Sequence, residues 1–249
     1  MKIPVVRGVI ERRILVNYHV DPGVLSPLLP APFRPKVVHG VGLVGICLIR
    51  VAQMRPTFLP AWLGTSSENA AHRTAVEWDD HGAFRDGVYV RRRDSNAWLN
   101  SFVGGRLFPG IHHHARFQGE ETSDHYAVAL RSDDGVTSMS VRGRRADRLP
   151  TSSVFRSLGE ASAFFQAGSL GYSATPDASR FQGLELRCRQ WQVEPLDVEE
   201  VHSSFFDDES LFPKGSIEFD CALLMRDIEH EWHGRSDLCC SINAQPGMD

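Results

Sequence analysis

Lysine is scarce in this chain of 249 residues, and its scarcity restricts the chemistry available to the protein. Lysine and arginine together number 27, and only Lys2, Lys36 and Lys214 are lysines, which leaves 24 arginines. Arginine effectively never loses its charge and cannot form an imine with a carbonyl compound. A reaction that proceeds through a lysine Schiff base is therefore restricted to three positions.

Long apolar runs and an excess of positive charge are also absent. The longest apolar run, Val41–Ile49, stops at Arg50, well short of the roughly 18 residues that span a bilayer. The first seven residues lack the apolar core of a signal peptide. The net charge is −4, so nothing draws the whole chain toward nucleic acid or anionic lipid. We expect a cytoplasmic protein with no membrane and no nucleic-acid partner.

Cysteine is infrequent and lacks the spacing of a metal or redox motif. No C-x-x-C pair occurs, and the number of cysteines is odd. This pattern predicts reduced, mostly buried thiols rather than a disulfide framework. The cysteines are Cys47, Cys188, Cys221, Cys239 and Cys240.

Strand-forming segments are numerous and helical segments are few and short. Neighbouring strands follow one another without long helices between them, which favours an antiparallel or mixed sheet of the mostly β, α+β class over a doubly wound α/β fold. We expect one domain over residues 1–235 and a flexible tail over 236–249. The expected strands are 12–18, 37–51, 74–78, 87–91, 111–118, 126–131, 137–142, 184–193 and 216–232, and the expected helices are 23–29, 97–107, 157–167 and 197–206.

The segment Gly40-Val-Gly-Leu-Val-Gly45 matches the dinucleotide-binding pattern G-x-G-x-x-G. Such a site needs a strand before the glycines and a helix after them. The residues that follow, Ile46–Val51, favour a strand. We interpret the glycines as points where a bent strand approaches another backbone closely, and we expect no cofactor.

Three consecutive histidines, His112, His113 and His114, are the most conspicuous local feature. In a strand, His112 and His114 share one face. They can form a solvated cluster, line a pocket, or bind a metal together with a third ligand such as Glu68. The arginine run at 91–93 is typical of a solvated face, but alternation along a strand can also turn Arg91 into a pocket, where it would bind a carboxylate.

Four stretches carry a likeness to a known family, namely Val20–Pro30, Val41–Gly45, Glu68-Asn69 with Arg73-Thr74 and Gly87–Val90, and Gly105–Ala115. Together they resemble an uncharacterised conserved bacterial family related to acetoacetate decarboxylase. The resemblance implies a curled antiparallel sheet that forms a cone or barrel around a central pocket, with peripheral helices, and a possible homo-oligomer.

The resemblance does not extend to the reactive lysine of the decarboxylase. That enzyme places its lysine just after a turn that corresponds here to Phe108-Pro109-Gly110, which is followed by Ile111 and His112. Imidazole cannot replace the amine in imine formation. We therefore expect a protein that acts on or binds a small organic acid or carbonyl compound without Schiff-base chemistry.

The candidate site residues follow from the resemblance and from their chemistry. Glu68 is the expected general acid or base, and His112 or His114 is its partner. Arg73, Arg91 and Arg106 are expected to bind an anionic group of the substrate. The alternative is a non-catalytic binding protein for small molecules on the same fold.

Overall fold

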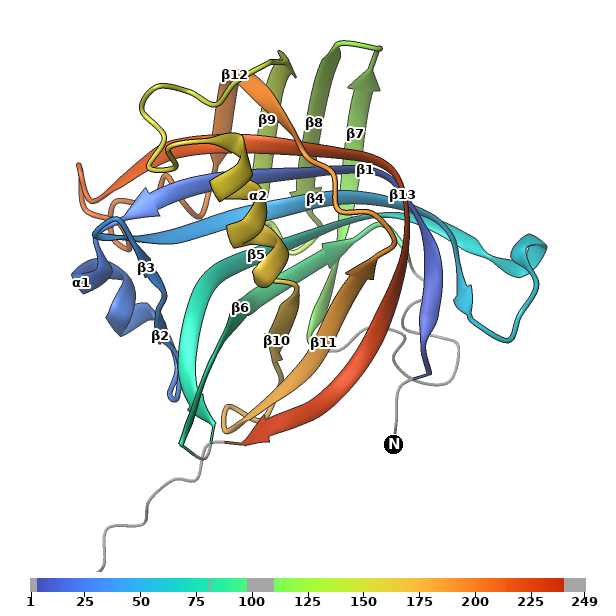
Figure 1. Cartoon of the computed structure of the whole chain (residues 1–249), viewed down its shortest axis with the longest axis horizontal. Helices are drawn as coiled ribbons and strands as arrows, with labels where there is room; N and C mark the ends of the chain where they lie inside the picture. Colours follow the sequence, from blue (N-terminus) through green and yellow to red (C-terminus); the bar gives the residue numbers. More distant parts are fainter. Residues whose placement is uncertain (1–3, 81, 98–109, 240–249) are drawn as a thin grey trace, which may run out of the picture.

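A computed structural model describes residues 4–80, 82–97 and 110–239 of the chain. Within this part, thirteen strands belong to one sheet, and the helices are short (Figure 1). The strands are β1 (Val6–Val20), β2 (Arg34–Pro35), β3 (Val37–Val38), β4 (Val41–Pro56), β5 (Thr65–Asp80), β6 (Ala83–Ser95), β7 (His112–Glu121), β8 (His125–Ser132), β9 (Ser138–Arg145), β10 (Leu170–Ala174), β11 (Arg180–Cys188), β12 (Glu194–Ser203) and β13 (Ile217–Cys239). The helices are α1 (Pro22–Leu25) and α2 (Leu158–Ala167), with 3₁₀ turns at Ser26–Leu28 and Ala61–Leu63.

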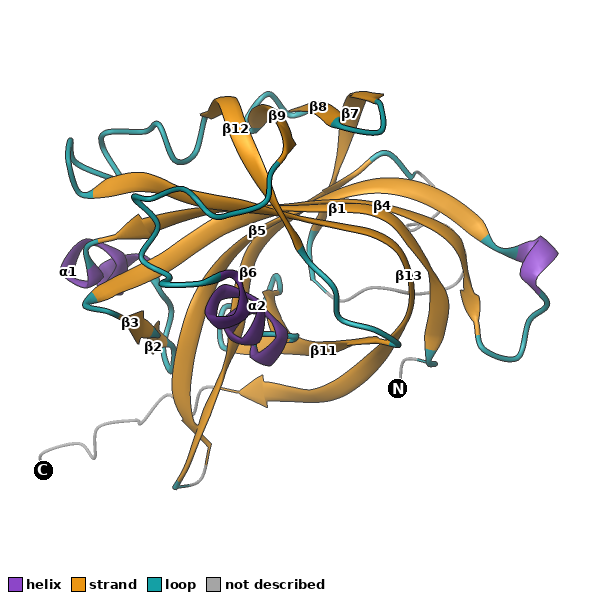
Figure 2. Ribbon diagram, turned by 45° about the horizontal axis from the view of Figure 1, so that its top comes forward, coloured by secondary structure: helices purple, strands orange, loops and turns teal. Residues whose placement is uncertain are grey.

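The sheet curls into a ring, which confirms the curled sheet of the expected fold class. Strand pairings run from β13 through β1, β4, β5, β6, β10 and β11 and return to β13. Figure 2 looks into this ring, with α2 beside its opening. Strands β7, β8, β9 and β12 form a second leaf that leaves the ring at β6 and rejoins it at β13 (Figure 1).

The long strands β1 and β4 are buried on both faces. One face packs into the core inside the ring, and the leaf covers the other face. In β4, Val44, Ile46 and Leu48 pack into the core beneath the leaf. The alternate residues Cys47 and Ile49 pack into the core inside the ring. The period of two residues in a strand thus divides one apolar run between two cores.

Local sequence signals account for the helix ends. Asp21 caps α1 by accepting a hydrogen bond from the Gly23 amide at 2.7 Å, and Pro22 stands at the first helical position. Ser157 caps α2 through the Glu160 amide at 3.1 Å. Both helices begin where the sequence predicts. Within the described residues, no helix is long and apolar enough to cross a membrane.

Two elements expected from the sequence differ in the structure, and a third lies mostly outside the described residues. Residues 197–206 were expected to be helical, but β12 runs through Ser203, because its glutamates pair with arginines of the neighbouring β9, as in the Arg144–Glu199 contact at 2.8 Å. Residues 236–239, expected to begin a flexible tail, are the last residues of β13 and pair with β11. Most of the expected helix over 97–107 lies outside the described residues.

Candidate functional site

A cavity of about 90 Å³ lies inside the ring. Its lining residues come from the strands of the ring, namely β1, β4, β5, β6, β10, β11 and β13, with additions from the start of β7 and from the segment that follows α2. A cavity needs at least about 10–15 Å³ of such space to hold one water molecule, so this one has room for a molecule of several non-hydrogen atoms.

Arg73 of β5 brings a positive charge to the wall of this cavity. Its Nη2 donates a hydrogen bond to the side-chain oxygen of Asn17, and its guanidinium lies 5.0 Å from the centroid of the Phe165 ring. Asn17 is held in turn by donating to the carbonyls of Leu15 and Cys221 at 3.0 and 3.1 Å. Burial lowers the pKa of Arg73 to about 10, so the group remains charged at neutral pH.

Two further guanidiniums line the same cavity. Arg93 of β6 donates to the hydroxyl of Ser173 at 3.1 and 3.0 Å, and burial lowers the pKa of Arg93 to about 10. Arg13 of β1 donates from Nε to the Cys47 sulfur at 3.2 Å. Among the described residues, neither of these arginines nor Arg73 has a carboxylate oxygen within 4.0 Å.

The electrostatic consequence is a small cavity whose three arginines have, among the described residues, no carboxylate within 4.0 Å to compensate their positive charges. A buried cation without a counter-ion is costly, because neutral hydrogen-bond partners replace its lost hydration only in part. A bound anion would supply that charge, and a carboxylate fits the planar guanidinium through paired hydrogen bonds.

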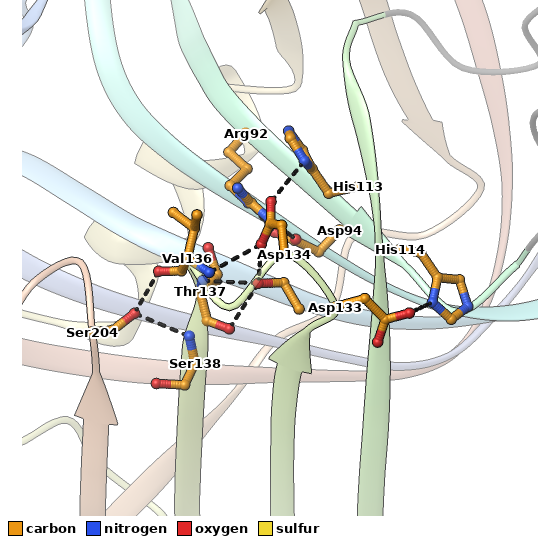
Figure 3. Close-up of polar contacts among 11 residues, drawn as sticks. Arg92, Asp94, His113, His114, Asp133, Asp134, Val136, Thr137, Ser138 and Ser204 are labelled. Carbon is orange, nitrogen blue, oxygen red and sulfur yellow. Dashed lines mark hydrogen bonds and ion pairs between the residues drawn. The ribbon is translucent and has the colours of Figure 1, made fainter.

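The acidic residue on the cavity wall, Asp94, is already engaged by another arginine. Arg92 donates to both oxygens of Asp94, at 2.8 to 3.0 Å, and also to Asp134 of the β8–β9 turn at 2.8 Å (Figure 3). Burial raises the pKa of Asp94, and the ion pair with Arg92 opposes this rise. A hydrogen bond from the Ser132 hydroxyl is the main reason that the pKa of Asp134 lies well below its usual value.

Glu68, the expected general acid or base, is not on the cavity wall. Its two carboxylate oxygens accept from Arg12 at 2.5 Å and from Arg50 at 2.6 Å. Both arginines also contact Glu121 at the end of β7, so this ion-pair network faces the leaf rather than the ring interior. The structure therefore does not bring Glu68 together with His112.

The two candidate histidines have different surroundings. His112 begins β7, pairs with Arg93 of β6 and lines the cavity. His114 does not line it, and its Nδ1 lies 2.6 Å from Asp133 (Figure 3). His113 contacts Asp134 at 3.0 Å. Among the described residues, no group of three histidine, cysteine or acidic side chains is placed to hold a metal ion.

The arginine run at 91–93 contributes Arg93 rather than the expected Arg91. The pairing of β5 with β6 shifts at this point, since Arg73 pairs with Val90 whereas His72 pairs with Arg92. Arg91 is the extra residue of this bulge, so Arg93 joins Val90 on the cavity wall. Arg91 is exposed and lies 5.5 Å from the centroid of the Phe205 ring. Arg106 lies outside the described residues.

Among the polar side chains of the cavity that sequence reasoning missed are Arg13, Cys47 and Arg93. Arg13 follows directly after the paired Arg12, and nothing in this doublet indicates which of the two enters the ring. The bulge that selects Arg93 has no sequence signal. Cys47 lies in the longest apolar run, which indicates burial but not a polar neighbour.

A wider surface cleft of about 410 Å³ is a weaker candidate than the cavity inside the ring. It also contains several arginines, but carboxylates compensate two of them. Arg187 contacts Glu185 at 2.7 Å, and Arg189 contacts Glu229 at 2.7 Å. The other two, Arg7 and Arg55, have no carboxylate within 4.0 Å among the described residues either, but they donate to backbone carbonyls and lie at or near the surface, where water screens their charge.

Comparisons with known proteins agree with this fold. The model of the DUF2071 family, described as an uncharacterised conserved protein, matches residues 9–221. No relative by sequence was found among curated proteins. The solved acetoacetate decarboxylase from Legionella pneumophila is 13% identical, with 93% of this chain and 87% of that chain covered and a TM-score of 0.57.

Two other solved structures have the same architecture. An acetoacetate decarboxylase-like enzyme from Sphingomonas wittichii RW1 is 11% identical, with 97% of this chain and 94% of that chain covered and a TM-score of 0.58. The enduracididine biosynthesis enzyme MppR, complexed with pyruvate, is 9% identical, with 96% and 91% covered and a TM-score of 0.57. Such identities show the fold alone. The family match spans most of the chain, and this protein therefore belongs to the DUF2071 family and has an acetoacetate decarboxylase-like fold.

Proposed function

We propose that the cavity inside the ring binds a small organic anion, a carboxylate with a few carbon atoms such as a 2-oxo acid. The observation that carries this proposal is the presence of Arg13, Arg73 and Arg93 on one small cavity without carboxylate partners among the described residues. Guanidinium groups suit carboxylates because they donate two parallel hydrogen bonds.

The size of the cavity and the comparison with MppR support the same class of ligand. A volume of about 90 Å³ favours a compact acid over an extended one. MppR, whose fold is similar, was solved in complex with pyruvate. Apolar residues such as Val90 and Leu186 form the rest of the wall and suit a short carbon chain.

The proposal involves no Schiff base. Lys36 lies beside a smaller cavity of about 30 Å³ that shares Arg13 and Arg73 with the main one. Its amine is paired with Asp86 and lies 4.9 Å from the centroid of the Phe164 ring. Lys214 is exposed, and Lys2 lies outside the described residues. Chemistry in the cavity would instead involve His112, which lines it.

Isothermal titration calorimetry with pyruvate tests the proposal. We expect pyruvate to bind and its neutral methyl ester to bind at least about ten-fold more weakly, because the ester lacks the charge that the arginines recognise. Arg93→Gln should weaken pyruvate binding by about 10- to 100-fold, the usual range for a hydrogen bond to a charged group.

Arg116→Gln is the matched control. Arg116 is 83% exposed, so this substitution removes the same charge from the surface and not from the cavity. It should leave the affinity unchanged. Equal binding of pyruvate and its ester, or equal effects of the two arginine variants, would contradict an anion site in the cavity.

A further inference from the structure

One thiol lies among the guanidiniums of the cavity. Cys47 of β4 is 6% exposed and lines the cavity wall. Its Sγ accepts a hydrogen bond from Nε of Arg13 at 3.2 Å. Cys221 is also buried but does not line the cavity, and Cys239 is exposed at the end of β13. Among the described cysteines, Cys47 alone lies on this wall.

Arg13 places a positive charge against the sulfur of Cys47. The thiolate, rather than the thiol, is the nucleophile, and adjacent arginines stabilise its negative charge. Arg13 is in direct contact with the sulfur, and Arg73 and Arg93 line the same cavity.

A second observation indicates that this place receives a ligand. Arg73 is nine-tenths buried, and its Nε has no hydrogen-bond acceptor in the structure. Its charge is likewise without a carboxylate among the described residues. A carboxylate seated on Arg73 and Arg93 would bring the rest of a small anion into the space that Cys47 also lines.

We propose that Cys47 is a nucleophile that adds reversibly to the keto carbon of a 2-oxo acid bound in the cavity. The inference rests on the proposed function, since the arginines must first hold the carboxylate. In the addition, a bond forms between Sγ and the keto carbon, and the π electrons of the carbonyl move to its oxygen. That oxygen takes up the proton lost by the thiol, giving a hemithioketal, and no oxidant or reductant is required.

Pyruvate labelled with ¹³C at the keto carbon tests the adduct by NMR, with the protein in excess. We expect a protein-dependent signal in the range of tetrahedral carbon, which is absent from Cys47→Ser. The hydrate of free pyruvate gives its own signal with or without protein and serves as the internal reference. Absence of the protein-dependent signal, or its persistence in Cys47→Ser, would overturn the proposal.

Bromopyruvate gives an independent readout, because alkylation forms a sulfur–carbon bond, releases bromide and sends the thiol proton to solvent. Peptide mass spectrometry would compare its labelling rate with that of the neutral iodoacetamide at Cys47 and at the exposed Cys239. We expect the bromopyruvate preference to be at least about ten-fold larger at Cys47, since guanidiniums recognise the carboxylate. Arg93→Gln and Arg73→Gln should each reduce this preference.

Equal preferences at Cys47 and Cys239, or no labelling of Cys47 in the folded protein, would also overturn the proposal. Calorimetry with pyruvate separates this failure from that of the binding site. If pyruvate binds but neither adduct nor selective labelling occurs, the anion site stands and the nucleophile is wrong. If pyruvate does not bind, both proposals fail.

Discussion

Neighbouring arginines of β1 serve opposite purposes in this protein. Arg12 is 1% exposed and is compensated by Glu68 and Glu121, at 2.5 Å each, on the leaf side of the sheet. Arg13 faces the ring interior and contacts Cys47. Alternation along the strand separates the two charges, so that one stabilises the joint between ring and leaf and the other adds to the charge of the cavity.

Glu68 is predicted to support the fold rather than ligand binding. Glu68→Gln removes one of the two charges that compensate Arg12, and we expect a loss of about 1–3 kcal/mol in the free energy of unfolding. Pyruvate affinity should change less than two-fold. Urea unfolding and calorimetry measure the two effects. A large loss of affinity at unchanged stability would instead place Glu68 in the site.

At the scale of single residues, the sequence indicates which chemical groups are present more reliably than the direction in which each side chain points. Arg73 and His112 were chosen by resemblance, and both line the cavity, while their roles remain predictions. Glu68 was chosen by its order along the chain, which does not determine the face of the strand from which a side chain projects. Arg93 depends on a bulge opposite the junction of His72 and Arg73 that no residue type announces.

At the scale of elements, glycine allows β4 to lie close against β1. A Cβ atom on Gly45 would lie 2.2 Å from the carbonyl oxygen of Val16 in the neighbouring strand. For Gly45 this agrees with our interpretation of the glycines as points of close backbone approach, whereas Gly40 meets no atom within 4 Å and stands at a φ of +89°.

Gly45→Ala should therefore destabilise the protein by about 1–3 kcal/mol, because the strands must separate to admit the methyl group. Gly159→Ala in α2 is the matched control. Its added Cβ meets only ordinary contacts. Alanine is about 0.5–1 kcal/mol more favourable than glycine within a helix, so this variant should be slightly more stable. Chemical denaturation of both variants measures the difference. Equal stabilities would show that the sheet adjusts without cost.

Elements with strong local signals were predictable, and those determined by distant partners were not. The β8–β9 hairpin surrounds the Asp133-Asp134-Gly135 turn, and α2 begins at its serine cap, as expected. Residues 197–203 contain two glutamates, which favour a helix, and two valines, which favour a strand. These residues form β12 because β9 offers a hydrogen-bonding edge and arginine partners, and tertiary context decides between the two propensities there.

At the scale of the whole molecule, the ring depends on pairings between distant parts of the chain. Strand β13 pairs with β1 and with β11, and β6 pairs in parallel with β10. Hydrophobic periodicity predicts strands but not their partners, so the curled sheet was accessible only through the resemblance to a known family. The expected homo-oligomer and the single domain over 1–235 stay predictions.

Two buried histidines on different strands make the stability of the whole protein depend on pH. Burial is the main cause that lowers the pKa of His72 in β5, and of His230 in β13, to about 4. Between the usual value of about 6.5 and 4, the unfolded chain takes up protons that the folded protein does not. Stability should therefore fall as the pH decreases through this window and then level off for these two groups.

From pH 7 to pH 5, each histidine should reduce the free energy of unfolding by about 2 kcal/mol. His72→Leu should remove about half of the combined loss, because leucine stays neutral among Phe205 and Phe206, which the imidazole contacts. His202→Leu changes a 68% exposed histidine and should leave the pH dependence unaltered. Urea unfolding at both pH values measures these differences. An unchanged pH dependence in His72→Leu would show that His72 takes up its proton equally in the folded and unfolded states.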